Sequence, residues 1–532
     1  MERFSTLRTY GGLSGFPKPS ESVHDPFVAG HASDSVSVGL GMARARTLQG
    51  QDYQVAVVIG DGALTGGLAY EGLNDAGESG EPMVVILNDN GMSIRQNVGA
   101  MSRHLARMRL KPGYFGLKKH YRKITDRLPG GKWIYRNLHR LKDWFRRKLI
   151  GVTVFEEMGF QYLGPVDGHD VSQLTFLLSQ ARQMGVPVLL HVITKKGRGF
   201  EPAETTPSAY HGVGRFDPET GICAGGGKET FSGTAGKTLC EIARQDGRLC
   251  AITAAMEDGT GLTSFEKEFH KRFFDVGIAE GHAVCMAAGL AKQGMIPVFA
   301  VYSTFLQRSF DMLIHDVSLL HLHVVFAVDR AGLVGEDGET HHGVFDVGYL
   351  RQVPGMQILC PASQKELKRM LKQAVLEMDG PVAVRYPKGG DGIYEQDLTQ
   401  RPLASGEDLT VVTYGTTIND VLFACKELKE KDGISAEILK LEQIWPLDCD
   451  DILQSVRKTG RLLVVEEIAA SGCIGTEILS CLQRNGIQAQ TALINLGEGI
   501  VPHGDLHSLK HLTGLDVPGI AQMAKEIMHR EK

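Results

Sequence analysis

Residues Val55–Ser93, VAVVIGDGALTGGLAYEGLNDAGESGEPMVVILNDNGMS, decide the fold of this chain. The apolar runs 55–59 and 83–87 are typical of buried strands, and the sequence 63–76 between them is typical of a helix. Two apolar strands around a helix predict a βαβ unit in a parallel sheet. Ligands bind such sheets beyond the carboxyl ends of the strands, where short turns rich in Gly, Asp and Asn follow both runs.

The two turns, GDG at 60–62 and NDN at 88–90, carry the first chemical signal. Asp61 and Asn90 offer hard oxygen ligands, which suit an octahedral Mg²⁺ that also takes phosphate oxygens. Gly60 and Gly62 allow the backbone to approach an anion, and the helix that follows offers free N–H groups. Either turn alone is equally consistent with an ordinary βα connection. Together they resemble the GDG…NDN motif of thiamin-diphosphate proteins.

Composition bounds the class of protein. A chain of 532 residues is too long for one core, and 42% hydrophobic with 22% charged residues is typical of a soluble globular protein. The net charge of −5 implies no acidic or basic partner. The scattered cysteines form no CxxC pair, which favours a reducing compartment over disulfides or zinc. Without a visible signal peptide or membrane-spanning run, we expect a cytoplasmic protein that binds neither membrane nor nucleic acid.

The order of apolar runs predicts an α/β fold with three α/β domains and mostly parallel sheets in the first two. We expect domains at 1–228, 229–400 and 401–532, with linkers near 225–227 and 396–406. The first domain carries a strongly basic stretch, 95–150, with interleaved aromatics. A nucleic-acid or membrane surface is one interpretation. A helical excursion with a solvated basic face is the interpretation that we favour.

Further candidates follow strands of the second domain. Glu280 lies between a strand and a small-residue helix, where a first-turn carboxylate is favoured by the helix dipole. The loop after the strand 324–328 is dense in Gly, Asp and His, which is typical of a site. Arg330 and Arg385 follow strands and are suited to fork onto a phosphate. His341 is suited to proton transfer near neutral pH.

Several phrases together resemble one family, the 1-deoxy-D-xylulose-5-phosphate synthases, which are transketolase-like thiamin-diphosphate enzymes. The match extends from about Arg3 to the C-terminus and includes YGGLSGFPK at 10–18, KKGRGFEPAE at 195–204, YSTFLQR at 302–308 and AVRYPKG at 383–389. The family condenses pyruvate with D-glyceraldehyde 3-phosphate and releases CO₂, using thiamin diphosphate and Mg²⁺. The resemblance also implies a homodimer.

The resemblance assigns roles to matching residues. Metal binding falls to Asp61, Asn90 and the Met92 carbonyl. Cofactor binding falls to His31, Gly60, Asp61, Gly62, Ala63, Asn90, Met92, Lys196, Glu280 and Phe305, with Glu280 on N1′ of the aminopyrimidine and Phe305 on its face. Proton transfer and catalysis fall to Glu280, His31, His211, His341, Tyr302 and Arg308. The substrate side falls to Tyr302, Arg308, Arg330, Asp337, His341 and Arg385.

The sequence also departs from the family pattern. The usual segment of about ninety residues before Met1 is missing, and with it a strand and a Gly-His-Gln turn. Gly281 stands where Gln is usual, Gly91 where Glu is common, and Asp34 brings a carboxylate near the diphosphate region, which predicts weaker cofactor binding. Two alternatives to an active synthase therefore stay open: a catalytically impaired paralogue or fragment with a binding or regulatory role, and another thiamin-dependent transketolase-type enzyme.

Overall fold

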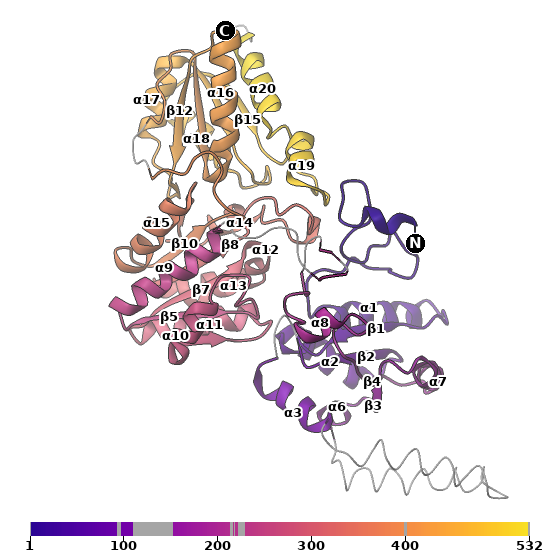
Figure 1. Cartoon of the computed structure of the whole chain (residues 1–532). Helices are drawn as coiled ribbons and strands as arrows, with labels where there is room; N and C mark the ends of the chain where they lie inside the picture. Colours follow the sequence, from indigo (N-terminus) through magenta and orange to yellow (C-terminus); the bar gives the residue numbers. More distant parts are fainter. Residues whose placement is uncertain are drawn as a thin grey trace, which may run out of the picture. The chain divides into compact units, whose positions relative to one another are not determined.

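The computed structural model describes residues 2–92, 97–109, 153–212, 216–217, 219–221, 229–397 and 402–529. The linker expected at 225–227 and most of the basic stretch 95–150 lie outside these residues, as does the centre of the second expected linker. The chain forms three sheets (Figure 1), and every pairing between their named strands is parallel except one. The α/β fold class with mostly parallel sheets is therefore confirmed.

The first sheet has the order β1-β2-β4-β3. Its strands are β1 (Ala56–Gly60), β2 (Val84–Asp89), β3 (Gln161–Asp167) and β4 (Val188–Ile193). The predicted βαβ unit is present, because β1 and β2 pair in parallel from Ala56↔Val84 to Gly60↔Asn88, with the 3-10 turn Ala63–Thr65 and helix α2 (Gly67–Ser79) between them. This pairing brings the ends of both strands, and hence both turns, to one edge.

Helices cover both faces of the first sheet. Helices α1 (Ser35–Leu48), α2 and α3 (Gly99–Arg109) share a core with the inward side chains of β1 and β2, among them Val57, Ile59 and Leu87. The other face packs on α7 (Val171–Arg182) through Leu174 and Leu177. Short helices α6 (Val154–Glu157) and α8 (Glu201–Thr205) complete this part. Strand β1 lies at the edge of the described sheet.

The second sheet has seven strands in the order β13-β9-β10-β8-β7-β5-β6. In chain order these are β5 (Leu249–Thr253), β6 (Phe273–Asp275), β7 (Ile296–Tyr302), β8 (Val324–Asp329), β9 (Gln357–Leu359), β10 (Pro381–Arg385) and β13 (Gln443–Trp445). Strand β13 is antiparallel to β9. The central strands β5, β7, β8 and β10 are buried along their whole length, as expected for a parallel sheet covered on both faces.

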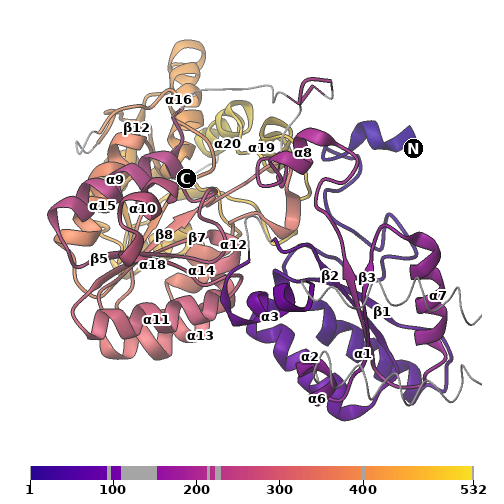
Figure 2. The same ribbon diagram turned by 60° about the horizontal axis from the view of Figure 1, so that its bottom comes forward.

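Two layers of helices enclose the second sheet (Figure 2). Helices α9 (Phe231–Gln245), α10 (Thr263–Glu268) and α15 (Gln364–Leu376) share one core with the sheet. Helix α11 (Glu280–Lys292) and α13 (Phe310–Met312) lie on the opposite face. Helix α12 (Ser303–Leu306) follows β7 directly, and α14 (Asp346–Leu350) follows the loop after β8.

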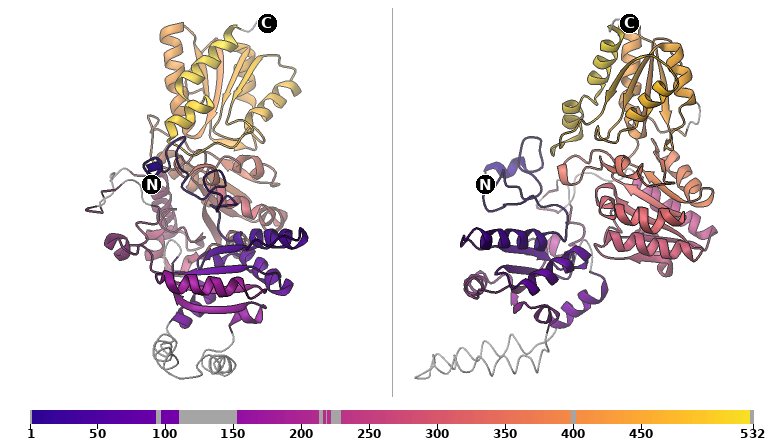
Figure 3. Two further views of the ribbon diagram at one scale, coloured as in Figure 1. Left: turned by 90° about the vertical axis from the view of Figure 1, so that its right-hand side faces the viewer. Right: turned by 180° about the vertical axis from the view of Figure 1, so that it is seen from behind.

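The third sheet is all parallel, in the order β12-β11-β14-β15. Its strands are β11 (Leu409–Tyr414), β12 (Ala436–Leu441), β14 (Arg461–Val465) and β15 (Gln490–Ile494). Helices α16 (Ile418–Asp432), α19 (Leu506–Thr513) and α20 (Val517–His529) pack on one face, and α17 (Asp450–Thr459) packs across the sheet from them (Figure 3). Helix α18 (Ile474–Arg484) follows β14.

Contacts between residues divide the chain into two compact units, 1–31 with 227–276 and 280–532, and 32–226 with 277–279. The second and third sheets belong to the first of these units, and β13, from the expected third domain, extends the second sheet. The three-domain boundaries stay a prediction. Among the described residues, no helix is both long and apolar enough to cross a membrane.

Candidate active site

The two turns that follow β1 and β2 lie together in unit 32–226. The backbone N–H of Asp61 donates to the Asn88 carbonyl at 3.2 Å. The Gly91 N–H donates to Asp61 Oδ2 at 2.8 Å and the Met92 N–H donates to Asn90 Oδ1 at 2.9 Å. Hydrogen bonds therefore join the two turns that carry the three predicted metal ligands. Gly91 has φ +75°, so the left-handed backbone here favours glycine over a residue with a side chain.

Asp61 has the electrostatics of an unfilled cation ligand. It is buried, and its Oδ1 atom has no hydrogen-bond partner among the described residues. Burial, a hydrogen bond with the Asp89 carboxyl and the charge of that group together raise the pKa of Asp61 to about 7, against the N–H groups of Gly91 and Asn90. Two acidic groups and an amide oxygen around an unpartnered oxygen fit a hard divalent cation.

Three buried side chains, joined by hydrogen bonds, support the turn after β2, and sequence reasoning missed them. The Tyr162 hydroxyl lies 2.7 Å from His191 Nδ1, and His191 Nε2 lies 2.9 Å from Asp89 Oδ2. His191 and Asp89 have no exposed surface, and Tyr162 is 2% exposed. The Tyr162 hydroxyl holds the imidazole, and the imidazole holds the Asp89 carboxyl, which faces Asp61. The signal was a histidine in the middle of the apolar strand run VPVLLHVIT.

Removing the imidazole tests this brace. We expect His191→Phe to lower the free energy of unfolding by about 3 kcal/mol, since a buried carboxylate loses a charge-assisted partner. We also expect Mg²⁺-dependent binding of thiamin diphosphate to weaken by about tenfold to a hundredfold, the usual cost of losing an outer support of a metal site. Fluorescence titration and thermal unfolding measure the two effects separately.

Tyr162→Phe is the matched control for His191→Phe. It removes the Tyr162 hydroxyl and leaves the His191–Asp89 contact in place. We therefore expect the free energy of unfolding to fall by about 1 kcal/mol and cofactor binding to stay almost unchanged. Equal cofactor affinity in His191→Phe and the unaltered chain would show that the brace serves stability alone.

Lys196 and His211 lie near the same turn. Lys196 Nζ is 2.8 Å from His211 Nδ1. Burial lowers the pKa of Lys196, and the Asp61 carboxylate raises it, so the ammonium lies within electrostatic reach of the candidate metal ligand. Burial and then the Lys196 charge lower the pKa of His211. The structure therefore brings both predicted residues to the side of Asp61.

Asp34 and Ala63 also lie in this unit. Asp34 caps the start of α1 without a side-chain hydrogen bond to the helix, and the prediction that its charge weakens cofactor binding stays a prediction. Ala63 begins the 3-10 turn after GDG, where its carbonyl accepts a hydrogen bond from Ser33 Oγ at 2.7 Å. Beside Gly60, a Cβ atom would meet nothing within 4 Å, so this part of the turn has open space around its backbone.

Glu280 is the first residue of α11 and is 4% exposed. Burial raises the pKa of its carboxyl, while its own backbone N–H and the charge of Arg308 lower it. A carboxyl in this state keeps a proton more readily than an exposed glutamate does. Next to it, a Cβ at Gly281 would lie 3.1 Å from Met312 Cε, so the side chain of relatives requires that flexible methionine to move.

An aromatic and histidine cluster lies in the same unit, 1–31 with 227–276 and 280–532. The His31 ring lies 5.0 Å from the Phe305 ring and 6.2 Å from the His341 ring, and Phe305 and His341 are 5.5 Å apart. Tyr302 stacks on Phe305 at 5.7 Å. The structure therefore brings these four predicted residues together.

Hydrogen bonds and burial set the protonation of the two histidines. His31 Nε2 lies 2.8 Å from the Thr340 carbonyl, which accepts a hydrogen bond only if this nitrogen carries the hydrogen. Burial lowers the pKa of His341 to about 4; the Asp337 charge raises it, and the charges of His31, Arg330 and Arg8 lower it. His341 is therefore a neutral imidazole near neutral pH, ready to accept a proton or donate a hydrogen bond.

Arg330 lies against Tyr302 at the ends of β8 and β7. The guanidinium carbon is 3.8 Å from the centre of the Tyr302 ring, a cation–π contact. Arg330 has φ +58°, a strained conformation for a residue with a side chain, and such strain clusters at functional sites. Burial raises the pKa of Tyr302, so its hydroxyl stays protonated.

Arg385 lies in a buried ion pair. Its Nε donates to Asp346 Oδ2 at 2.9 Å and its Nη2 to the Gly343 carbonyl at 3.3 Å, and the side chain is 7% exposed. This ion pair links β10 and α14, and the role of Arg385 on the substrate phosphate stays a prediction. The cation presented on this loop is Lys388, whose Nζ lies 3.2 Å from Asp337 Oδ2 and which sequence reasoning missed.

Asp329, the last residue of β8, gives a pH-dependent prediction. It is fully buried, and burial raises its pKa from 3.8 to about 6 against the charges of Arg330 and Lys388. The folded chain therefore holds a proton that the unfolded chain releases between these values, and stability falls as pH rises through that window. We expect Asp329→Asn to gain about 3 kcal/mol relative to the unaltered chain between pH 4 and pH 7.

Denaturant unfolding at both pH values measures the gain from Asp329→Asn. Asp316→Asn, which changes a partly exposed carboxylate in a helical layer on the same sheet, is the control. The difference in unfolding free energy between Asp316→Asn and the unaltered chain should stay constant from pH 4 to pH 7. A difference between Asp329→Asn and the unaltered chain that stays constant from pH 4 to pH 7 would contradict the raised pKa.

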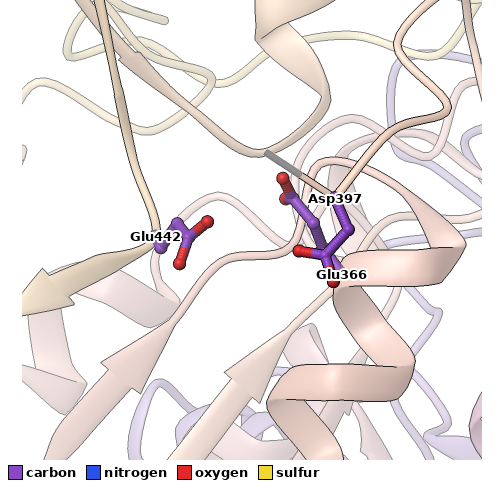
Figure 4. Close-up of side chains that lie close together, drawn as sticks. All are labelled: Glu366, Asp397 and Glu442. Atoms are coloured by element: carbon purple, nitrogen blue, oxygen red, sulfur yellow. The ribbon is translucent and has the colours of Figure 1, made fainter. Parts of the chain in front are cut away.

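A second group of acidic side chains, Glu366, Asp397 and Glu442, lies close enough to suggest a metal (Figure 4). Cations already neutralise it. Lys440 Nζ contacts Glu366, and Arg369 donates to Asp397 at 2.8 Å and to Glu442 at 2.9 Å. The Tyr394 hydroxyl and the Ala362 N–H also donate to Glu366. This cluster is a structural ion network between the second and third sheets.

Three family models match successive parts of this chain. The family model described as 1-deoxy-D-xylulose-5-phosphate synthase matches residues 1–194. The pyrimidine-binding domain of transketolase matches residues 229–390, and the C-terminal domain of transketolase matches 400–520.

Relatives match over almost the whole chain. A 1-deoxy-D-xylulose-5-phosphate synthase of Heliobacterium modesticaldum is 46% identical over 539 residues, which cover 99% of this chain and 83% of that protein. Synthase 1 of Geobacter sulfurreducens is 47% identical and covers 98% of this chain and 83% of its own length. Among solved structures, a split gene transketolase, described as an inactive β4 tetramer, matches with a TM-score of 0.51 and 25% identity over 57% of this chain and 100% of its own.

Proposed function

The chain belongs to the 1-deoxy-D-xylulose-5-phosphate synthase family, and from that premise we propose that it condenses pyruvate with D-glyceraldehyde 3-phosphate to 1-deoxy-D-xylulose 5-phosphate and CO₂. The product is a precursor for isoprenoids and thiamin. The observation that carries the proposal is the buried Asp61 carboxyl, whose Oδ1 has no hydrogen-bond partner among the described residues and would be satisfied by a cation at the turn. A buried polar atom without a partner destabilises the fold, and a protein without this activity has no need of such an atom.

The residues present fit the family's cofactor, thiamin diphosphate with Mg²⁺. Asp61, Asn90 and the Met92 carbonyl supply hard oxygens for the metal that holds the diphosphate. Glu280 would hold the aminopyrimidine, and the Phe305 ring would cover its face. When bound, the cofactor supplies an electron sink for the carbon that loses CO₂.

Glu280 is suited to hold the proton that this chemistry requires. Because burial raises its pKa, its carboxyl donates a hydrogen bond to a ring nitrogen more readily than an exposed glutamate. The Thr340 carbonyl holds His31 at Nε2, and neutral His341, whose ring lies 6.2 Å from the His31 ring, donates or accepts a hydrogen bond at an imidazole nitrogen. His211 and Lys196 place further polar groups beside the diphosphate turn.

The acceptor side consists of Tyr302, Arg308, Arg330 and Asp337. Tyr302 keeps its hydroxyl proton and donates a hydrogen bond to a substrate oxygen. The Arg330 guanidinium, fixed over the Tyr302 ring, offers N–H donors to an anionic group. Arg308 acts on Glu280 through its charge. These side chains orient the aldehyde toward the reacting carbon.

We extend the proposal to the organisation of the protein. We propose domains at 1–228, 229–400 and 401–532, and the matched family models cover 1–194, 229–390 and 400–520. A homodimer is proposed because the family is homodimeric. A reducing compartment such as the cytoplasm is proposed because all eight cysteines among the described residues are free thiols.

The experiment that tests this function measures labelled CO₂ released from pyruvate by the purified chain with thiamin diphosphate and Mg²⁺. Release should be stimulated by D-glyceraldehyde 3-phosphate and accompanied by the ketose phosphate. Turnover of a ketose donor in place of pyruvate would reassign the chain to transketolase chemistry. Cofactor binding without any release would leave a binding or regulatory role.

A further inference from the structure

A surface cleft of about 410 Å³ is lined by residues of α17 and α18, and none of its lining residues belongs to the candidate active site. Cys449, the residue that precedes α17, and Cys481, in the last turn of α18, both line this cleft and are half-buried. The ring of Trp445 and the acidic side chains of Asp448 and Glu477 line it as well. The cleft therefore opens two thiols from different helices to small molecules in solution.

The two thiols of the cleft are in contact. The Cys449 thiol forms a hydrogen bond with the Cys481 sulfur. Burial, this hydrogen bond and the charge of Cys481 raise the pKa of Cys449 to about 12, against the charge of Arg484. Cys449 therefore keeps its proton and donates it toward the Cys481 sulfur. A disulfide requires two neighbouring cysteines whose side chains point at each other, and this contact meets that condition.

The surroundings of Cys481 make it the sulfur that is suited to attack. Asn485 Nδ2 donates to Cys481 Sγ at 3.8 Å. The Arg484 guanidinium forms hydrogen bonds with the Glu477 carboxylate and with the Cys481 sulfur, and both partners raise the pKa of Arg484. The Glu477 contact, 2.8 Å from Oε1 to Arg484 Nη2, fixes the guanidinium beside the thiol. Donors and a positive charge beside a sulfur favour the thiolate, which is the nucleophile in disulfide exchange.

The other thiols among the described residues differ from this pair. Cys285, on α11, is exposed, and its Sγ donates to Asp316 Oδ2 at 3.3 Å. Burial and this carboxylate raise the pKa of Cys285 to about 11, so its thiol attacks slowly despite its exposure. The remaining five are buried in the fold: Cys240, Cys250, Cys360, Cys425 and Cys473. The cleft is therefore where thiol chemistry is most accessible in the described part of the chain.

We propose that Cys449 and Cys481 are a reversible redox pair, which a low-molecular-weight disulfide oxidises to an intramolecular disulfide. This inference goes beyond the proposed function and does not depend on it. In a reducing compartment such a disulfide is transient, as in proteins that sense the redox state. While it lasts, it ties the start of α17 to the end of α18 and stabilises this part of the chain.

The exchange proceeds in two balanced steps. The Cys481 thiolate attacks one sulfur of the small disulfide, breaks its S–S bond and releases one small thiolate. Cys449 then gives up its proton and attacks Cys481 Sγ, which releases the second small thiolate. Each released thiolate takes up the proton that a protein thiol has lost. The charge of Cys481 is absent from the mixed disulfide, so one cause of the raised pKa of Cys449 is removed before the second step.

The first test incubates the purified full chain with glutathione disulfide and follows free thiols. Of the nine cysteines of the chain, we expect two to lose their thiols first and to recover them with dithiothreitol. Mass spectrometry should find the peptides of Cys449 and Cys481 joined, and the oxidised chain should unfold at a temperature several degrees higher. Oxidation at other cysteines first, or no oxidation while a dithiol peptide in the same solution is oxidised, would overturn the proposal.

The second test separates the two thiols with variants. Cys449→Ser should stop at the mixed disulfide and carry one glutathione on Cys481. Cys481→Ser should take up glutathione at Cys449 at least about tenfold more slowly. Cys285→Ser is the matched control, because it removes a more exposed thiol elsewhere in the same unit and should form the disulfide at the unaltered rate. Equal rates of uptake in Cys449→Ser and Cys481→Ser, or loss of the disulfide in Cys285→Ser, would overturn the proposal.

Discussion

Glu280→Gln is expected to lower kcat about a thousandfold while thiamin diphosphate still binds, because positioned proton transfer contributes about 10²- to 10⁴-fold. The glutamine keeps the size of the side chain and loses the proton that the buried carboxyl holds. The raised pKa also sets the effect on stability. The folded chain resists ionisation of Glu280 as pH rises above the pKa of the unfolded chain, and Gln has no such penalty. The variant should therefore gain stability toward neutral pH as it loses activity.

The measurement pairs labelled CO₂ release with thermal unfolding at two pH values. Asp450→Asn is the control, because Asp450 is an exposed carboxylate at the first position of another helix, α17, and tests the helix dipole alone. It should leave kcat unchanged. A fall in kcat of less than about tenfold in Glu280→Gln would identify Glu280 as an ordinary helix-start acid.

Local sequence was sufficient for most strands, because buried parallel strands are short, apolar and β-branched. It missed β3, where Gly164 and Pro165 interrupt the apolar pattern and a register shift lies between Leu163 and Val166. It also missed β13, three residues long, which pairs among the described strands with β9, far earlier in the chain. Pairing over such a separation leaves no periodic trace in either segment.

The residues of the candidate site also fall into those that local sequence predicts and those that it misses. Asp61 and Asn90 were predictable because each follows a strand and the pairing of β1 with β2 brings those strand ends together. Glu280 was predictable because it lies between a strand and the start of a helix. Tyr162, His191 and Arg8 were not predictable, because their partners are distant in sequence. A pattern places a residue on an element, but the choice of ionic partner depends on which side chains the fold brings within reach.

Arg385 and Lys388 illustrate that limit. Both are cations at the end of β10, and the sequence favours the arginine for its planar fork. In the fold, Arg385 meets the buried Asp346 and is held there, and Lys388, three residues on, reaches Asp337. A buried carboxylate requires its counter-ion, so the arginine near it serves structure first.

Asp61→Asn is expected to weaken Mg²⁺-dependent binding of thiamin diphosphate by at least about a hundredfold and to stabilise the metal-free chain. The binding loss follows because an amide replaces the anionic oxygen that the metal requires. The gain in stability follows because Asp61 and Asp89 are two acidic groups in one buried contact, and an amide ends their repulsion. Most substitutions at a buried site destabilise, so a variant that gains stability and loses the ligand is diagnostic.

The pH dependence separates repulsion from other causes of the Asp61→Asn effect. With a pKa of about 7 in the fold and 3.8 as its ordinary value, Asp61 keeps a proton that the unfolded chain releases, so the metal-free chain loses stability as pH rises across this window. Asp61→Asn should remove that slope. Asp75→Asn, which breaks only an exposed pair with Arg44 in the same unit, should keep it. If thermal unfolding shows that Asp61→Asn loses stability with rising pH as the unaltered chain does, the Asp61–Asp89 contact is not the source of that loss. The turn is then not a site kept for a cation.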